Sequence, residues 1–410
     1  MITKMFGRKP FYGWWVVIAC AAIQFYLGGT FIYGFTAVFN PLTEEFGWSY
    51  AMTSLAFSFR GFETGLLAPA AGFLVDRFST RKLFFAGVLI TSLGFLLFSR
   101  VSSLVSLYTA IIVLTLGYSF ISPVLTITIV TRWFTKHTTL AIGFVTTGLA
   151  ASGLLVPGVV WVVDQLGWKN AIFIFGIGMV LFCIPLSLLV KSPPGAQLPQ
   201  PPESLPVSGV KSVNEFKKNE VSKILKLKDF WLLAAAVLFS GVAGLAIIVH
   251  LIPYQVSVGI TRQAAGLSAI VFSLSNIGGR VIFGLLGDAY DRRYILALAG
   301  LINGLGILAF AMSTDSTHFA ISLALMGIGY GGIVPLRPVL QLDLFGRETF
   351  GTVQGLLMAL VTVGSIVAPP FAGWMFDSTG SYRPAFVVLS IVSLLTIPVT
   401  LAITKRSRQS

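Results

Sequence analysis

The sequence is poor in charged residues. Only 10% of its 410 residues are Asp, Glu, Lys or Arg, whereas a soluble domain typically has roughly 25%. This scarcity excludes an ordinary water-soluble globular protein. Apolar runs of about 20 residues, long enough to cross a bilayer as helices, recur along nearly the whole chain. We predict an all-α polytopic membrane protein with twelve spans at 14–39, 49–75, 82–99, 104–131, 138–163, 169–190, 229–256, 264–287, 294–312, 317–342, 350–375 and 384–404.

Cysteine is also scarce. Cys20 and Cys183 are the two present, and both fall within expected spans, so no disulfide framework is expected. The sequence contains no recognisable metal-ligand cluster, no Ser–His–Asp arrangement in a plausible pocket and no phosphate-binding glycine loop. We therefore expect no enzyme activity and no cofactor, and we expect gradients rather than ATP to drive any transport.

The net charge of +13 is explained by membrane topology rather than by nucleic-acid binding. If both termini are cytoplasmic, 21 of the 28 Lys and Arg lie in inner segments, four in outer loops and three within spans. This is the positive-inside distribution. The basic start, MITKMFGRKP, precedes an apolar run without a small-residue cleavage pattern, so we expect an uncleaved first span. We expect a multi-pass protein of the inner (plasma) membrane.

One long polar stretch, residues 191–228, divides the spans into two sets of six. Its proline-rich start is typical of an extended linker, and residues 214–228 suit either an amphipathic helix on the inner membrane surface or a solvated connector. We therefore expect an N-terminal six-helix bundle at 1–190, a cytoplasmic linker at 191–228 and a C-terminal six-helix bundle at 229–410.

The two halves repeat one another. GFLVDRFSTRK at 72–82 parallels GLLGDAYDRRY at 284–294, and GYSFISP at 117–123 parallels GYGGIVP at 329–335, both offset by 212 residues. A parallel repeat of this kind is typical of a transporter built from two pseudo-two-fold-related bundles, with the substrate site between them.

The first of these motifs resembles the signature of the major facilitator superfamily, G-x-L-x-D-R-x-G-x-R-[RK], with serine in place of its second glycine. The resemblance covers essentially the full chain and implies alternating access. We interpret the motif residues as a conformational latch whose contacts break and reform as the halves rock; the alternative is a topogenic loop with incidental acids. The expected latch residues are Gly72, Asp76, Arg77, Arg81, Gly284, Asp288 and Arg292.

Within that superfamily, WFTKHTTLAIGFVTTG at 133–148 resembles the start of span five in the monocarboxylate (lactate/pyruvate) transporter family, here as a prokaryotic member. The family's span-one signature survives only as YGWWVV at 12–17, without its acid and without the lysine of mammalian members. The resemblance implies a substrate-binding arginine in span eight, where Arg280 stands. Asn276 occupies the position of the family's acid in that helix.

Arg280 lies about 12 Å from the inner end of span eight, eight residues before Asp288. A guanidinium near the bilayer midplane must face protein or water, and it suits bidentate binding of a carboxylate. Asn276, Gly284 and Ser273 share its helix face. Because Arg337 is placed nearer the inner end of span ten, the expected charge balance is one cation for one monocarboxylate. The alternative is an Arg280 paired to protein within an interior network.

Other side chains are expected to complete the site. Tyr118 and Tyr330 occupy equivalent places in the two halves and could donate to a carboxylate or hydroxyl, although each also suits simple packing. The apolar wall is expected from Phe31 and Tyr33 of span one, Val145 and Leu149 of span five, and Phe283 or Leu336 opposite.

Two groups are candidates for proton coupling. His250 lies in the outer half of span seven, and histidine titrates in the physiological range. Glu63 lies in the outer half of span two, three residues from Arg60, with which an ion pair is the competing interpretation.

The sequence therefore predicts a secondary active transporter that carries a small monocarboxylate and a proton together. An organic-anion exchanger of the oxalate–formate type, a membrane sensor of organic acids and a drug-efflux pump are the alternatives. A sensor should carry an added soluble domain, and an efflux pump commonly places an acid in its cavity. The lipid bilayer is the expected surrounding, and short loops favour a monomer without an ancillary subunit.

Overall fold

The computed structural model describes residues 11–59, 80–134, 138–191, 224–346 and 350–404. Contacts between α-carbons divide the chain into two compact units. The first contains Met1–Trp48 and Phe62–Gln200, and the second contains Ser49–Gly61 and Pro201–Ser410. The short segment after Trp48 therefore packs with the C-terminal unit, a feature that the expected division at residues 190 and 229 does not include. That division stays a prediction.

The first unit is entirely helical in the residues described. Its first span begins as α1, passes through a π-helical turn and ends as α2. The expected span at 82–99 is the single helix α5, whereas the spans after it are assembled from shorter helices. The elements are α1 (Tyr12–Leu27), the turn Gly28–Ile32, α2 (Phe35–Phe46), α5 (Thr80–Phe98), α6 (Leu104–Ser119), α7 (Pro123–Trp133), α8 (Thr138–Ala151), the 3-10 turn Ser152–Leu155, α9 (Val156–Leu166), α10 (Trp168–Gly178), the π-helical turn Met179–Cys183 and α11 (Ile184–Leu189).

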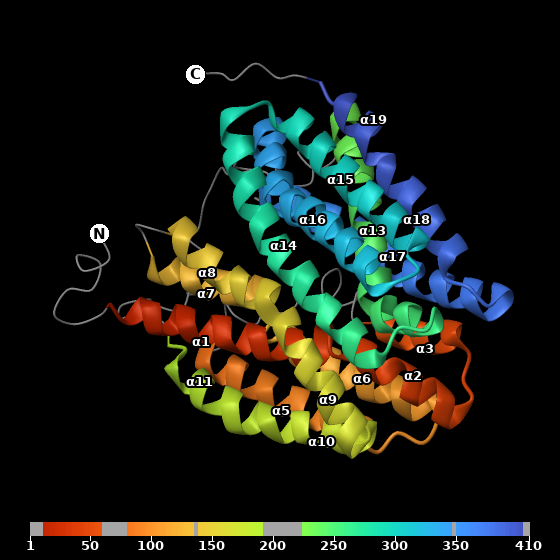
Figure 1. The fold of residues 1–410 in the computed structure, drawn as a ribbon. Coiled ribbons are helices and arrows are strands. Elements are labelled where there is room, and N and C mark those ends of the chain that lie inside the picture. Colours follow the sequence, from red (N-terminus) through yellow and green to blue (C-terminus); the bar gives the residue numbers. More distant parts are fainter. Residues whose placement is uncertain (1–10, 60–79, 135–137, 192–223, 347–349, 405–410) are drawn as a thin grey trace. The chain divides into compact units, whose positions relative to one another are not determined.

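The second unit consists mainly of long, continuous helices, of which α14, α15 and α16 lie side by side (Figure 1). Its elements are α3 (Tyr50–Ser58), α13 (Lys228–Ser257), α14 (Arg262–Ala289), α15 (Arg292–Met312), α16 (Ser316–Phe345), α17 (Phe350–Thr379), α18 (Arg383–Leu394) and α19 (Thr396–Leu401). Buried apolar side chains of α13, α15, α16 and α17 form a continuous core in this unit.

The expected all-α polytopic membrane fold of two six-helix bundles is confirmed. Within the ranges described, ten helical segments are long and apolar enough to cross a membrane. The expected span at 49–75 is described only through α3. The span at 104–131 is divided into α6 and α7, so neither piece alone reaches the length of a full crossing. The stretch 214–228 lies mostly outside the described residues.

The break between α6 and α7 has a local cause in the sequence. Pro123, which has no backbone N–H, is the first residue of α7, and the side chain of Ser122 caps that helix. Gln24 of α1 donates from Nε2 to the carbonyl of Ile121 at 2.6 Å, which satisfies a backbone acceptor freed by the break. In the second half of the repeat, Pro335 stands inside the continuous helix α16.

Glycines allow α14 and α16 to pack with their backbones nearly in contact. A β-carbon added at Gly331 would lie 2.2 Å from the carbonyl oxygen of Asn276, and one added at Gly279 would lie 2.3 Å from the carbonyl oxygen of Ile328. No side chain fits at either distance. These contacts fix the height of α16 against α14, and therefore the positions of the polar residues on the two helices.

The helix α3 is held to the second unit by a carboxylate cap. Asp377, near the end of α17, accepts hydrogen bonds from the backbone N–H groups of Tyr50 and Ala51, both at 2.9 Å. The backbone of Gly373 touches Tyr50 so closely that an added β-carbon would lie 2.6 Å away. Since these donors have no partner within their own helix, Asp377 supplies the capping acceptor from another one.

Candidate functional site

The polar face expected on α14 is present. Arg280 donates from Nε to Oδ1 of Asn276 at 3.0 Å, across one helical turn. Asn276 and Ser273 are buried, whereas Leu274, Val281 and Leu285, which lie on other faces of α14, are exposed. The hydroxyl of Ser273 has no hydrogen-bond partner in the structure. The helix therefore has one polar face inside the protein and an apolar surface suited to lipid.

Gly284 lies one turn beyond Arg280 on α14. A β-carbon added there would meet nothing within 4 Å. It therefore leaves open space next to the arginine, in contrast to Gly279, whose environment is filled by the backbone of α16. Phe283, named as a possible wall residue, is buried against Gly332 of α16.

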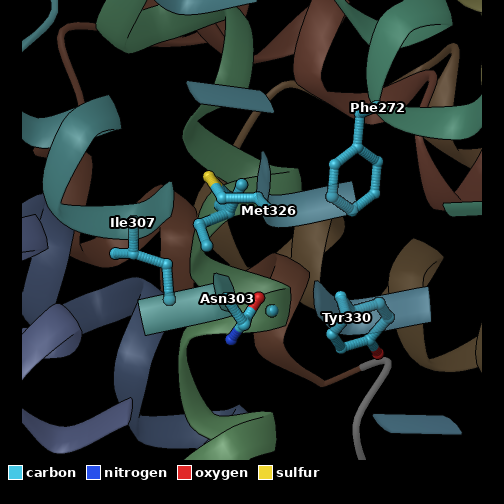
Figure 2. Close-up of a pocket in the computed structure, with 7 residues that line it drawn as sticks. Phe272, Asn303, Ile307, Met326 and Tyr330 are labelled. Atoms are coloured by element: carbon cyan, nitrogen blue, oxygen red, sulfur yellow. The ribbon is translucent and has the colours of Figure 1, made fainter. Parts of the chain in front are cut away.

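Tyr330 lines a small pocket inside the second unit (Figure 2). Four helices form it: the lining residues are Gly244 and Ile247 of α13, Phe272 of α14, Asn303 and Ile307 of α15, and Met326 and Tyr330 of α16. The ring centroids of Tyr330 and Phe272 are 6.4 Å apart. Asn303 adds a side-chain amide to this mainly apolar lining, and its Nδ2 donates to the hydroxyl of Ser393 at 3.1 Å.

Gly244 makes room for the ring of Tyr330. An added β-carbon at Gly244 would lie 3.3 Å from that ring and 3.6 Å from the phenol oxygen. The tyrosine is half-buried, with one ring face toward the pocket. It therefore combines a fixed apolar ring with a hydroxyl that can donate a hydrogen bond.

The candidates in the first unit form an aromatic cluster. Tyr118, near the end of α6, is buried, and its ring centroid lies 5.5 Å from that of Phe31 in an edge-to-face arrangement. Phe31 also contacts Phe35 and Phe95, with centroids 5.1 and 6.4 Å away. Phe31 is fully buried, so in this structure it supports the tyrosine from within the core.

The remaining wall candidates differ in exposure. Val145 of α8 is buried, whereas Leu149 and Tyr33 are half-buried. Leu149 packs on Gly28, where an added β-carbon would lie 2.9 Å from its methyl group. This close approach brings α8 against the π-helical turn that carries Phe31.

His250 is fully buried in α13 and lies in a network of polar groups from three other helices or their ends. Its Nε2 lies 3.0 Å from the carbonyl oxygen of Pro369 and 3.1 Å from Oγ of Ser54, and its Nδ1 lies 3.0 Å from the hydroxyl of Tyr382. Because a carbonyl can only accept, the Nε2–H tautomer fits, with Nδ1 accepting from Tyr382. The sequence did not point to Ser54 or Tyr382, which are far from His250 along the chain.

The expected latch is described only in part. Gly72, Asp76 and Arg77 lie outside the described residues, as does Glu63, the second candidate for proton coupling. Arg81 and Asp288 are exposed.

In the second copy of the repeated motif, at 284–294, Arg292 makes an ion pair and a hydrogen bond to the backbone. It donates from Nη1 to both carboxylate oxygens of Asp343 in α16, at 2.5 and 2.6 Å, and from Nε to the carbonyl of Gly287 at 3.2 Å. Asp343 was not among the expected residues, because only the packing of α15 against α16 brings it to Arg292. An acid near the end of span ten, facing the basic turn at 292–293, was the available signal.

Arg337 lies in α16, which continues to Phe345, past the expected end at 342. The residue before it, Leu336, packs against Gly287 of α14, so Arg337 lies near the level of Gly287 rather than of Arg280. The second unit therefore holds a second guanidinium group at a different depth from the first.

Ten of the described helical segments are long and apolar enough to cross a membrane, and α14 turns a polar face toward the protein interior. The chain matches the Major Facilitator Superfamily over residues 14–261 and 232–410, and it belongs to that family. As a member of that family it is a transporter and not an enzyme.

Among curated proteins, the chain is similar to Monocarboxylate transporter 12 of Mus musculus, at 27% identity over 92% of this chain and 82% of the relative. It is also similar to Monocarboxylate transporter 2 of Homo sapiens, at 26% identity over 90% and 81%. Among solved structures, it resembles a bacterial homologue of the human lysosomal transporter Spinster in an inward-facing, occupied conformation. The TM-score is 0.70, at 16% identity over 97% of each chain.

Proposed function

We propose that this protein transports small monocarboxylates such as lactate and pyruvate across the plasma membrane together with a proton. The observation that carries this proposal is the Arg280–Asn276 pair. Asn276 accepts from Nε, which orients the guanidinium while its two Nη groups suit a carboxylate. The names of the curated relatives, which are monocarboxylate transporters, support the same substrate class.

In the proposed cycle, the halves at 1–190 and 229–410 rock about a site between them while the linker at 191–228 stays cytoplasmic, as do both termini. The carboxylate of the anion binds the guanidinium of Arg280, and their attraction is strong in a low dielectric. Tyr118 and Tyr330 donate to the substrate, and Phe31, Tyr33, Val145 and Leu149 form or support the apolar wall. The motif residues around Gly284 and Arg292 form the latch.

The proton is proposed to reside on His250, with Glu63 as the second candidate. Support for His250 comes from its buried network, in which Nδ1 faces the hydroxyl of Tyr382. Protonation makes Nδ1 a donor, so the hydroxyl must turn from donor to acceptor. A change in one proton would thereby alter the contact between α13 and Tyr382, the residue that precedes α18.

The test is uptake of radiolabelled lactate into proteoliposomes with an imposed pH step, followed by the same assay with carboxylate inside and no step. Symport predicts accumulation that follows the pH gradient. If uptake ignores the step and responds only to internal carboxylate, the protein is an exchanger. The absence of uptake under every condition would reject the substrate class.

We also propose that the transporter works as a monomer without an ancillary subunit. Light scattering of the detergent-solubilised protein, coupled to size-exclusion chromatography, tests this directly. A polypeptide mass of one chain, 44.1 kDa, is expected, and transport by proteoliposomes that contain this protein alone would exclude the need for a second subunit.

A further inference from the structure

Arg337 is a cation that the proposed carboxylate site does not use. It follows Tyr330 by seven residues, or two turns of α16, and so lies on the same helix face. Its Nη2 donates to Oγ of Ser240 in α13 at 3.0 Å, and its Nε is buried without a hydrogen-bond partner. A neutral hydroxyl is the hydrogen-bonding partner that the structure gives it, so its charge is not compensated by an ion pair there.

The nearest acid along α16 is engaged elsewhere. Asp343, six residues beyond Arg337, holds Arg292 through both carboxylate oxygens. In the ranges that the structure describes, no carboxylate pairs with Arg337. Its other electrostatic neighbour is the phenol of Tyr330, which ordinarily carries no charge.

The side of α13 that faces this guanidinium is made of small residues. An added β-carbon at Gly241 would lie 3.6 Å from Nη2 of Arg337, and Ser240 precedes it. Gly244 lies beside Tyr330 in the same way. This part of α13 therefore brings small, uncharged residues toward the tyrosine and the arginine, and none of them compensates the charge of the guanidinium.

Packing places Arg337 at a different depth from Arg280. Gly331 meets Asn276, and the side chain of Leu336 meets Gly287. Arg337 therefore stands at about the level of Gly287, seven residues beyond Arg280, or ~10 Å farther along the bundle. Tyr330 lies near the level of Arg280. One face of α16 thus leads from the level of the first cation to the second.

We infer that Arg337 forms a second anion site, which takes the carboxylate of a small monocarboxylic acid after it leaves Arg280. This inference rests on the proposed monocarboxylate function. The chemistry favours it because a buried guanidinium without a counter-ion gains most from a singly charged group that can accept from Nε and Nη together. Handover between two cations also avoids holding the anion too tightly at either one, a requirement for turnover.

The experiment measures thermal stabilisation of the detergent-solubilised full chain by acetate and by lactate, with chloride held constant. The variants are Arg280→Gln, Arg337→Gln and the double variant. Arg280→Gln should keep a saturable stabilisation by carboxylate, and adding Arg337→Gln should abolish it or raise the half-saturating acetate concentration at least ten-fold. In the Arg280→Gln background, Arg337→Lys keeps the charge but lacks the planar pair of donors. Its stabilisation by acetate should still saturate, with a half-saturating concentration between those of Arg280→Gln and the double Gln variant.

Two results would overturn the second site: loss of all carboxylate stabilisation in Arg280→Gln alone, or full retention of it in the double variant. If Arg337→Gln does not fold, the comparison is between Arg280→Gln and the double variant Arg280→Gln/Arg337→Lys. An equal half-saturating acetate concentration in these two proteins would exclude Arg337 as the group that binds the carboxylate. Lactate uptake by the wild-type protein is a separate measurement. Its failure would reject the proposed function while leaving an Arg337-dependent acetate shift intact.

Discussion

Asn276 accepts a hydrogen bond at 3.0 Å from Nε of Arg280, which lies one turn later on the same helix. The amide is buried, and its own backbone carbonyl is pressed against Gly331 of α16. The position of the arginine is thus tied to the packing of two helices. A neutral amide at this place orients the guanidinium without cancelling its charge.

Replacement of Asn276 tests this orientation. Asn276→Leu keeps the branched shape of the side chain but removes the acceptor, so lactate KM should rise about ten-fold, in line with roughly 1.5 kcal/mol for a hydrogen bond to a charged group. Asn276→Asp should lower transport further, because the new carboxylate competes with the substrate for Arg280. Leu274→Met on the exposed face is the control and should leave KM unchanged. An unaltered KM in Asn276→Leu would separate Asn276 from substrate binding.

The hydroxyl of Tyr330 is expected to contribute to binding rather than to folding. Tyr330→Phe keeps the ring against Phe272 and the pocket, so stability should change little while lactate KM rises about five- to ten-fold through loss of one hydrogen bond. Tyr254→Phe is the matched control, since its hydroxyl donates to the carbonyl of Ala311 at 2.6 Å inside the second unit. That variant should lose about 1 kcal/mol of stability without a change in KM. The reverse pattern would assign Tyr330 a packing role.

Coupling to the proton is expected to depend on His250. His250→Gln can still donate to the carbonyl of Pro369 but cannot bind a proton, so lactate exchange should persist while accumulation driven by a pH step is lost. His318→Gln, at an exposed position near the start of α16, should preserve accumulation. If the His250 variant still accumulates lactate when the pH step is imposed, Glu63 becomes the leading candidate.

The close contact of α14 and α16 should tolerate no side chain. Gly331→Ala places a methyl group 2.2 Å from the carbonyl oxygen of Asn276, so the helices must separate, with an expected destabilisation of about 1–3 kcal/mol and a raised lactate KM. Gly278→Ala, on the same helix α14 as Asn276, has open space within 4 Å and should change neither quantity by comparable amounts. Thermal unfolding of both variants in one detergent makes the comparison. Equal stability of the two would contradict the packing described for Gly331.

The helical membrane fold could be predicted from the sequence because apolar runs of span length leave few alternatives. The split of the fourth span was less accessible, since Pro123 breaks a helix there whereas Pro335 at the equivalent place does not. The difference arises from the surroundings of each proline, including Gln24, which accommodates the freed carbonyl of Ile121.

Part of the candidate site could be predicted from the sequence and part could not. The Arg280–Asn276 pair follows from helical spacing, and the structure contains it. The partners of His250 could not be read from the chain, because Ser54 and Tyr382 are brought to it by long-range packing. The partner of Arg337 could not be predicted either, because Ser240 of α13 is brought to it by packing between helices.

The most direct test of the central claim is the initial rate of lactate uptake by Arg280→Lys in proteoliposomes with an imposed pH step. Lysine keeps the charge but lacks the planar pair of donors, so kcat/KM should fall at least about 100-fold, close to 3 kcal/mol. Arg262→Lys, at the first residue of α14, is the control and should transport like the wild type. Uptake by Arg280→Lys within two-fold of the wild type would contradict carboxylate recognition by Arg280.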